Sequence, residues 1–297
     1  MRFLFVSSIH EIDGNKIRGN VNFTAQEPWR RDGARGTLQI STSVVSEAIG
    51  QLVSWLSMRN NDFTARPVFL FASQINLDGY IPAPSVVDLE AWITDGDENS
   101  FIFSGTAKVD GKVVVEITDC GGYFMPLAEL EDPAVTRQRF ADLMAVGGLP
   151  ANPPGPVYSS QKLVDEVREI QIGQSISAVK ILSPSEPFYA DHFPRNPVTP
   201  IVVINEMIGE ATRRMMAGQG GDSALELMPV AVRDLKIKSF IVPGDTAVIM
   251  IKKVEVLDNE FETIAEIMVN QKKILRGRYR YKFVDQGLRS ANSKKIN

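Results

Sequence analysis

Polar and hydrophobic residues alternate along several long stretches of the chain, with the two-residue period of β-strands. Residues 101–109 and 112–117 alternate in this way on either side of an Asp-Gly pair, which predicts an antiparallel hairpin. Residues 246–256 predict another such strand. Residues 201–217, in contrast, contain no helix breaker except one glycine and are apolar around most of the helical circumference. Because such a helix must be enclosed, we predict an α+β fold in which a curved antiparallel sheet wraps around a long central helix.

The predicted elements occur twice along the chain, in the same order and at an offset of 159 residues. Residues 27–51 align without gaps with residues 186–210, and seven of the twenty-five positions are identical. Each copy predicts a hairpin, a loop, a long apolar helix and then three or four long strands. The sequence therefore predicts a duplicated unit.

Shifts in composition suggest where the two units begin and end. We expect the first unit at residues 1–130 and the second at residues 164–286. Residues 131–163 include a short amphipathic helix at 136–144 and a stretch rich in glycine and proline, so we predict a linker that crosses the surface. Residues 287–297 are polar and basic, and we expect a disordered tail there.

Composition and charge exclude several classes of function. The formal net charge is −4 and the pI is about 5.4, so the chain lacks the basic surface that nucleic-acid binding requires. The single cysteine, Cys120, excludes an internal disulfide, and we interpret it as a structural thiol at the end of a strand. The apolar run near the N-terminus is too short for a signal peptide or a membrane span. We therefore expect a cytoplasmic protein without a membrane segment.

A proline-rich loop carries His192, one of only two histidines in the chain, and leads into the second long helix. Prolines at positions 187, 194, 197 and 200 fix φ and remove hydrogen-bond donors, so the loop is stiff and non-helical. The helix that follows carries a carboxylate, Glu206. An imidazole beside a helix carboxylate suits proton transfer. Taken singly, His192 also fits a hydrogen-bonded structural residue and Glu206 a charge that reaches water. We interpret the other histidine, His10, as structural.

The loop, the turn and the helix carboxylate together resemble the 3-hydroxyacyl-ACP dehydratase family of the hot-dog fold. Residues 191–194 (Asp-His-Phe-Pro) are similar to the family's His-Phe-Pro loop, and residues 197–200 (Pro-Val-Thr-Pro) to its Pro-Val-x-Pro turn. Glu206 then follows His192 by fourteen residues. The sequence departs from the family at Ile201, where a glycine is usual. The resemblance implies a tandem, or double, hot-dog in a single chain.

The two copies differ at the chemical positions. His192 aligns with Gly33, so the first copy lacks the imidazole, whereas both helices keep a carboxylate, as Glu47 and Glu206. In the family, paired hot-dogs place the histidine of one unit against the carboxylate of the other. If this arrangement carries over, His192 pairs with Glu47 in one working site, and Glu206 belongs to a vestigial one. The alternative pairing of His192 with Glu206 stays open, because the sequence does not determine the geometry between the units.

The resemblance also implies a role for each residue, with neither a cofactor nor a metal. His192 is the expected base for the C2 proton, and Glu47 the expected acid for the leaving C3 hydroxyl. Backbone N–H groups at a helix N-terminus, at Ile201 or at Thr42 in the first unit, are expected to stabilise the enolate oxygen. The residues expected beside the acyl chain are Phe193, Val44, Gly50, Gln51 and Val203.

A glycine follows each helix carboxylate by three residues, as Gly50 and Gly209. Glycine inside a helix costs about 1 kcal/mol relative to alanine. Its presence twice suggests that another backbone or a substrate chain approaches closely, and core packing is an equal explanation.

The expected substrate is an acyl-ACP or acyl-CoA thioester in fatty-acid or polyketide-like synthesis, with acyl carrier protein as a partner. The resemblance also allows a homodimer of double hot-dogs. Four arginines near the site, Arg30, Arg31, Arg35 and Arg195, fit either a basic rim for the carrier or ordinary solvated loop residues.

Two alternative functions remain open at this point. A hot-dog thioesterase would use a helix carboxylate to activate water, but it does not need the His-Phe-Pro loop. A non-catalytic protein that binds acyl thioesters, or a scaffold, would account for the altered first loop and for Ile201.

Overall fold

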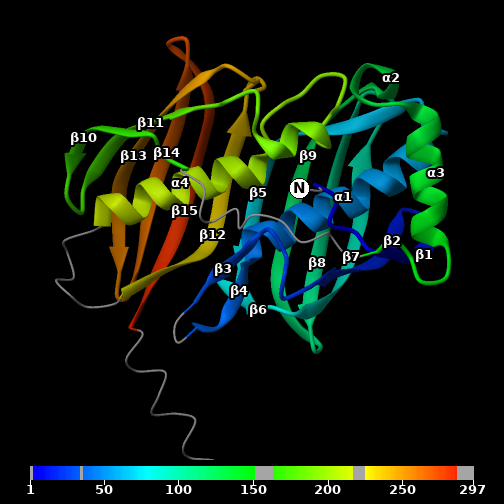
Figure 1. Ribbon diagram of the computed structural model, residues 1–297, viewed down its shortest axis with the longest axis horizontal. Coiled ribbons are helices and arrows are strands. Elements are labelled where there is room, and N and C mark those ends of the chain that lie inside the picture. The colour runs from blue at the N-terminus through cyan, green and yellow to red at the C-terminus, as the bar shows by residue number, and fades with distance from the viewer. Residues whose placement is uncertain (1–2, 34–35, 151–162, 217–224, 286–297) are drawn as a thin grey trace, which may run out of the picture.

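The computed structural model describes residues 3–33, 36–150, 163–216 and 225–285. Within them, a twelve-stranded sheet curves around two long helices, α1 (Thr42–Asn60) and α4 (Ile201–Met216), which lie on the same face of the sheet (Figure 1). Neighbouring strands of this sheet pair antiparallel throughout. The predicted α+β architecture is therefore confirmed.

The strands fall into two sets of the same layout. The first set comprises β1 (Ser8–Asp13), β2 (Lys16–Phe23), β5 (Ala65–Leu77), β7 (Ser85–Gly96), β8 (Ser100–Val109) and β9 (Lys112–Pro126). The second comprises β10 (Glu166–Gln171), β11 (Ser175–Ile181), β12 (Leu225–Ile237), β13 (Thr246–Leu257), β14 (Glu260–Val269) and β15 (Lys272–Asp285). A separate small sheet contains β3 (Arg30–Asp32), β4 (Leu38–Ser41) and β6 (Tyr80–Pro82).

The two sets meet at the pair β5 and β12 in the middle of the sheet. Outward from this seam the order is β5-β9-β8-β7-β2-β1 on one side and β12-β15-β14-β13-β11-β10 on the other. Each position outward holds corresponding elements of the two copies, and α1 and α4 begin 159 residues apart. The predicted repeat is confirmed, and its two copies form one continuous sheet.

Helix α1 is enclosed by the sheet because it is apolar on nearly every side. Its first turn is capped by Ser41, whose side chain accepts a hydrogen bond from the Ser43 backbone N–H.

The two glycines inside the long helices, Gly50 of α1 and Gly209 of α4, have no close neighbour. A Cβ at Gly50 would lie 3.4 Å from the Phe69 ring, and a Cβ at Gly209 would lie 3.7 Å from Arg213, both ordinary contact distances. The expectation that a backbone approaches these glycines closely is therefore wrong.

The described part of the predicted linker packs against the first copy. The helix predicted at 136–144 is observed as α3 (Pro133–Met144), and Asp132 caps its N-terminus. Phe140 in α3 contacts the rings of Trp55 and Phe63. Residues 151–162 lie outside the described residues, as do the predicted tail residues 287–297. The unit boundaries at 130 and 164 stay a prediction.

Cys120 lies inside β9 and is buried, so its predicted position at a strand end is wrong. Burial raises the pKa of its thiol to about 12, and the nearby Glu47 charge acts in the same direction. Cys120 is therefore a protonated thiol at neutral pH. In the described ranges, no helix is both long and apolar enough to cross a bilayer.

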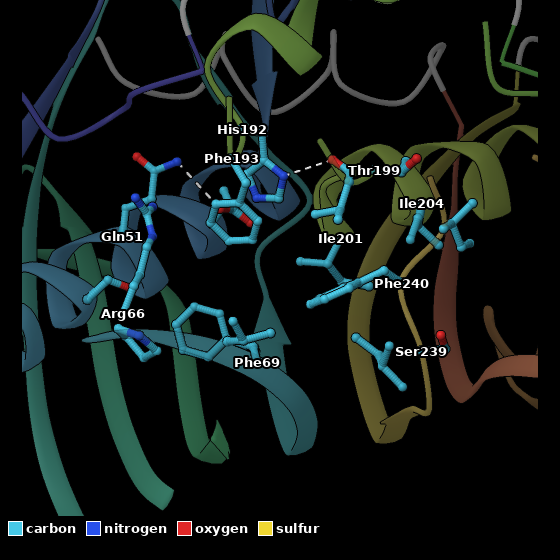
Figure 2. Close-up of a pocket in the computed structure, with 17 residues that line it drawn as sticks. Gln51, Arg66, Phe69, His192, Phe193, Thr199, Ile201, Ile204, Ser239 and Phe240 are labelled. Atoms are coloured by element: carbon cyan, nitrogen blue, oxygen red, sulfur yellow. Dashed lines mark hydrogen bonds between the residues drawn. The ribbon is translucent and has the colours of Figure 1, made fainter. Parts of the chain in front are cut away.

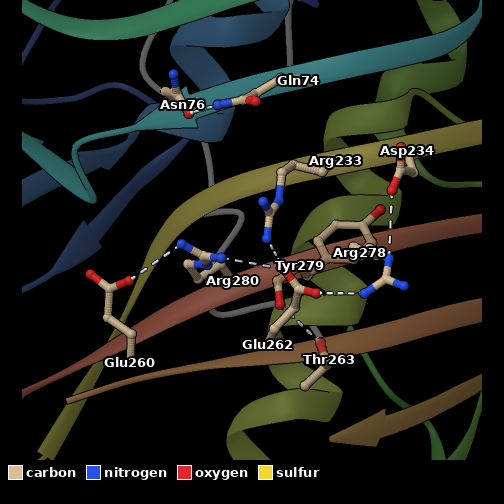
Figure 3. A network of polar contacts seen from close by, with 10 residues as sticks. All are labelled: Gln74, Asn76, Arg233, Asp234, Glu260, Glu262, Thr263, Arg278, Tyr279 and Arg280. Carbon is tan, nitrogen blue, oxygen red and sulfur yellow. Dashed lines mark hydrogen bonds and ion pairs between the residues drawn. The ribbon is translucent and has the colours of Figure 1, made fainter. Parts of the chain in front are cut away.

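Figure 3 shows a network of charged side chains over the adjacent strands β12, β15 and β14. The Glu262 side chain in β14 is only 2% exposed, and it accepts a 2.8 Å hydrogen bond from Arg278. It also pairs with Arg233, and Arg280 lies 3.7 Å away. Burial alone would raise the pKa of Glu262, but the arginines hold it below its usual value. The ionised carboxylate thus connects three neighbouring strands.

Candidate active site

A pocket lies between the two copies and is lined by both of them (Figure 2). From the first copy, helix α1 and strand β5 contribute one wall. From the second copy, the His192 loop, the start of α4 and the segment after β12 contribute the other. The lining residues are Glu47, Gln51, Ser54, Arg66, Pro67, Val68, Phe69, His192, Phe193, Val198, Thr199, Ile201, Ile204, Ile237, Ser239, Phe240 and Ile241.

The loop holds His192 rigidly. A short 3₁₀ helix, Pro187–Ala190, precedes the loop, and the His192 N–H donates to the Phe188 carbonyl at 3.0 Å. The Phe193 ring stacks on the imidazole, with 4.3 Å between centroids and 20° between planes. Phe193 adopts a φ of 60°, in the left-handed region that costs a bulky residue about 1–3 kcal/mol. The loop therefore keeps a strained conformation that places this ring against the histidine.

The hydrogen bond of His192 determines which nitrogen carries the proton. Its Nδ1 lies 2.9 Å from the Val198 carbonyl oxygen, which can only accept, so Nδ1–H is the donor. Nε2 then keeps a free lone pair. Burial lowers the pKa of His192 to about 3; the Val198 bond opposes this shift and the Arg66 charge adds to it. At neutral pH the imidazole is uncharged and able to accept a proton.

Glu47 presents its carboxyl group to the same pocket from α1. Gln51, one helical turn further on, donates its Nε2 to the Glu47 Oε1 at 3.4 Å. Burial raises the pKa of Glu47 to about 7, although the Gln51 bond and the Arg66 charge both oppose the rise. A large fraction of Glu47 is thus protonated near neutral pH, which suits a proton donor.

The two expected backbone donors have different environments. Ile201 lines the pocket at the first position of α4, where helix N–H groups have no partner within the helix. Thr42 is buried, and its N–H and its hydroxyl both bind the Gly79 carbonyl, at 3.0 Å and 2.9 Å. The amide of Thr42 is therefore already used in the fold, and its prediction as an oxyanion donor is wrong.

Of the residues expected beside the acyl chain, some line the pocket and others are buried elsewhere. Gln51 and Phe193 line the pocket. Val44 and Val203 are each only 1% exposed and belong to the hydrophobic core. Gly50 is buried next to the Phe69 ring. These three residues do not line this pocket.

The counterpart of the pocket in the first copy lacks the same chemistry. Gly33 stands where the second copy has His192, and the Gln39 side chain fills the space beside it, 2.4 Å from where a Cβ would lie. Glu206 does not line the pocket that contains His192. It instead interacts electrostatically with Arg213 and Tyr281. The structure thus brings His192 together with Glu47 and separates it from Glu206.

Arg66, a cation that lines this pocket from β5, was not predicted from the sequence. Its guanidinium forms an ion pair with the buried Glu131 and lies 4.9 Å from the centre of the Phe193 ring. The sequence does contain an indication that Arg66 is special, because it is the single charged residue of β5. A charge in such a strand requires a partner, but the sequence does not say which one.

The arginines for which a basic rim and ordinary loop positions were both open contact neighbours within the chain, where the structure describes them. Arg195 donates to the Ala128 carbonyl at 2.9 Å and to Asp132 at 3.0 Å, which fastens the His192 loop to the end of the first copy. The guanidinium of Arg31 lies 4.2 Å from the centre of the Tyr80 ring. Arg30 donates to the Glu27 carbonyl. Arg35 lies outside the described residues.

Comparison with known proteins identifies similar sequences and similar folds. A model described as the FabA-like domain matches residues 158–278. The FabZ 3-hydroxyacyl-[acyl-carrier-protein] dehydratase of Wolbachia sp. subsp. Brugia malayi (strain TRS) is 34% identical over 90 residues, covering 29% of this chain and 62% of that protein. The FabZ of Wolbachia sp. subsp. Drosophila simulans (strain wRi) is 31% identical over 107 residues, covering 35% and 75%. The chain thus spans about three fifths of the length of the first of these relatives.

Solved structures show the fold alone. The bifunctional dehydratase-cyclase domain of ambruticin biosynthesis superposes with a TM-score of 0.51 at 14% identity, covering 97% of this chain and 99% of that one. The 12:0-ACP thioesterase from Umbellularia californica gives a TM-score of 0.53 at 9% identity, covering 91% and 95%. The double hot-dog fold is thereby confirmed. Together with the FabZ relatives, these findings show that the chain belongs to the FabA-like family of hot-dog proteins that includes the FabZ dehydratases.

Proposed function

We propose that the chain removes water from a 3-hydroxyacyl thioester and forms the trans-2-enoyl thioester, with the chemistry in the pocket between the two copies. The observation that carries this proposal is the pairing in one pocket of a neutral imidazole, His192, with a carboxyl, Glu47, whose pKa burial raises to about 7. The FabZ relatives support the same reaction class.

His192 is the proposed base. Its Nε2 lone pair removes the C2 proton of the substrate, while the Val198 carbonyl holds Nδ1–H and stabilises the imidazolium that forms. The electron pair of the C–H bond moves toward the thioester carbonyl and places negative charge on its oxygen. The backbone N–H groups in the first turn of α4, at Ile201, are the proposed donors to that oxygen.

Glu47 is the proposed acid. Its carboxyl proton passes to the C3 hydroxyl, the C3–O bond breaks, and the enolate electrons form the C2–C3 double bond as water leaves. The enzyme is then left with a protonated His192 and an ionised Glu47. Transfer of the proton from the imidazolium to the carboxylate, through water in the pocket, restores the starting state.

The proposal also includes the carrier of the acyl group and the pathway in which the reaction takes place. The FabZ relatives are named for substrates carried on acyl carrier protein. We infer an acyl-ACP thioester as the substrate, with acyl-CoA as an alternative carrier, and a role in fatty-acid or polyketide-like synthesis. The active form is inferred to be the double hot-dog, and a dimer of such chains is compatible with it.

A thioesterase reaction is the main competing function, since acyl-ACP thioesterases share the fold. In that reaction a helix carboxylate activates water and must be ionised. Burial instead raises the pKa of Glu47 to about 7, which favours a proton donor. The environment of Glu47 therefore favours dehydration.

Hydration of a trans-2-enoyl thioester, the reverse reaction, tests the assignment. We expect His192→Ala and Glu47→Gln each to lower kcat by about 10²–10⁴-fold, because each removes a proton-transfer group. The matched control is Glu206→Gln, which changes the equivalent carboxylate of the other helix and should leave kcat nearly unchanged.

Three results would contradict the proposal in different ways. Loss of activity in Glu206→Gln but not in Glu47→Gln would show that the pairing is wrong. Release of free acid from a saturated acyl thioester, without hydration of the enoyl form, would identify a thioesterase. Tight binding of the enoyl thioester without turnover by the wild type would indicate a binding protein.

A further inference from the structure

A short extended segment near the N-terminus, Phe3–Phe5, connects the supports of both proposed catalytic residues. The Phe3 N–H donates to the Asp191 carboxylate at 3.1 Å, in the loop that carries His192. The Phe3 carbonyl accepts from the Gln51 Nε2 at 3.4 Å, and the Phe5 N–H donates to the Gln51 Oε1 at 2.9 Å. Since Gln51 also binds Glu47, one segment contacts elements of both copies at the site.

The Phe3 side chain contacts the imidazole itself. The edge-to-face contact with His192 has 5.0 Å between centroids and 76° between planes. Phe193 stacks on the same imidazole at 4.3 Å. Phe3 is only 1% exposed, and its ring is held by Trp29 at 5.6 Å and by Phe5 at 5.2 Å. Two aromatic rings, one from each copy, thus determine the orientation of His192.

We propose that Phe3 is a positioning residue for the reaction, because its ring orients the His192 imidazole and its main chain ties the His192 loop to Gln51 and so to Glu47. This inference rests on the proposed function, in which these two groups transfer the protons. The apolar run at residues 3–7 did not indicate this role, and these residues precede β1, which begins at Ser8.

Loss of the Phe3 ring has a defined physical consequence. The imidazole gains rotational freedom and contact with water, so the distance from Nε2 to the C2 proton is less well controlled. A misplacement of about 1 Å costs on the order of 10²-fold in rate. Substrate binding depends mainly on other walls of the pocket, so we expect the loss in kcat and little change in KM. Arg66 of β5, Glu47 of α1 and Asp191 of the loop are the charged or titratable groups around His192 and are unchanged by the substitution.

A pair of matched variants separates positioning from core packing. Phe3→Leu removes the ring that touches His192. Phe23→Leu changes a ring of β2 that is 2% exposed and packs on Phe5, and among the described residues its ring contacts neither Phe3 nor His192. Both variants should lose similar thermal stability. We expect kcat for enoyl-thioester hydration to fall about 10–100-fold in Phe3→Leu and less than about threefold in Phe23→Leu.

Nitrogen NMR of histidine provides a readout that does not depend on turnover. The chain has two histidines, and His10 is exposed and distant from the pocket lining, so it serves as an internal reference. Phe3→Leu should shift the ring nitrogen signals of His192 and leave those of His10 unchanged, whereas Phe23→Leu should leave both unchanged. If the wild type proves inactive as a dehydratase, the proposed function fails while this measurement still decides the positioning role.

The hydrogen bond from the Phe3 N–H to the Asp191 carboxylate can be tested separately. Asp191→Ala removes the acceptor of the Phe3 N–H, whereas Asp191→Asn keeps an acceptor oxygen at the same place. We expect kcat to fall in the alanine variant and to recover at least partly in the asparagine variant. Equal kcat losses in Phe3→Leu and Phe23→Leu at equal stability, or His192 signals that do not respond to Phe3→Leu, would overturn the proposal.

Discussion

At the scale of single residues, the site contains two groups that burial keeps uncharged. Burial disfavours the charged form of any group, so the same pocket lowers the pKa of His192 to about 3 and raises that of Glu47 to about 7. Between these values the base is unprotonated and the acid is protonated. Neutral forms of both residues are therefore the resting state, and the proton transfers of the reaction create charge only transiently.

This pair predicts the pH dependence of dehydration. Activity requires unprotonated His192, which is favoured above pH 3, and protonated Glu47, which is favoured below pH 7. We therefore expect kcat/KM to be flat on the acidic side of neutrality and to fall above about pH 7. A profile measured from pH 5 to pH 9 checks this. A fall below pH 6.5 with a plateau at pH 8 would indicate an ordinary histidine and an ionised glutamate, contrary to the prediction.

Arg66 and Glu131 provide a more specific test of the same electrostatics. The positive charge of Arg66 opposes the rise in the pKa of Glu47, and Glu131 pairs with Arg66. Arg66→Gln should therefore move the alkaline limb of kcat/KM to higher pH, and Glu131→Gln should move it to lower pH. Both substitutions break the same ion pair, so a purely structural effect would lower the rate without moving the limb in opposite directions.

At the scale of elements, the sequence predicts those features that depend on contacts between residues close together in the chain. Two helices, the hairpin at the Asp110-Gly111 pair and the repeat follow from periodicity and turn residues, and each is present. The pairing of His192 with Glu47 was implied by the resemblance to the dehydratase family, and the alternative pairing with Glu206 was left open. Arg66, Phe3 and the tie from Arg195 to Asp132 were missed because each depends on elements that approach only after folding. Thr42 was misassigned for the same reason, since its partner is the distant Gly79.

The helical glycines give a prediction at this scale. Nothing crowds a Cβ at Gly209 of α4, whose nearest neighbour is the flexible end of Arg213 at 3.7 Å. Gly209→Ala should therefore stabilise the protein by about 0.5–1 kcal/mol, because alanine has the higher helix propensity. Chemical unfolding in urea measures the change. Gly50→Ala in α1 is the matched variant, where contact with Phe69 at 3.4 Å should reduce the gain. Destabilisation by Gly209→Ala would show that the position is packed more tightly than the structure indicates.

At the scale of the whole molecule, the site exists because the two copies share a sheet and a core. The seam between β5 and β12 is an ordinary antiparallel pair. Below the His192 loop, a small apolar cluster combines Val68 and Leu130 with Phe193 and Val198. The Arg195 N–H donates to the Leu130 carbonyl at 2.9 Å in the same place. The geometry of the pocket therefore depends on contacts between the copies as much as on either copy alone.

Continuity of the sheet predicts that the two copies unfold together. The three tryptophans, Trp29, Trp55 and Trp92, all lie in the first copy, so their fluorescence reports on that copy. Ile249 in β13 of the second copy and Ile17 in β2 of the first are both 0% exposed. Replacing either by valine removes one buried methylene and should cost about 1 kcal/mol.

If the two copies unfold as one cooperative unit, Ile249→Val should lower the midpoint of the tryptophan transition by about 2–4 °C. This shift should equal that of Ile17→Val, although no tryptophan is near Ile249 in the sequence. Calorimetry should show a single peak in the wild type and in both variants. If the copies instead unfold independently, Ile249→Val leaves the tryptophan midpoint unchanged and a second peak separates. The outcome matters for function, because a pocket with one wall from each copy needs both copies to stay folded together.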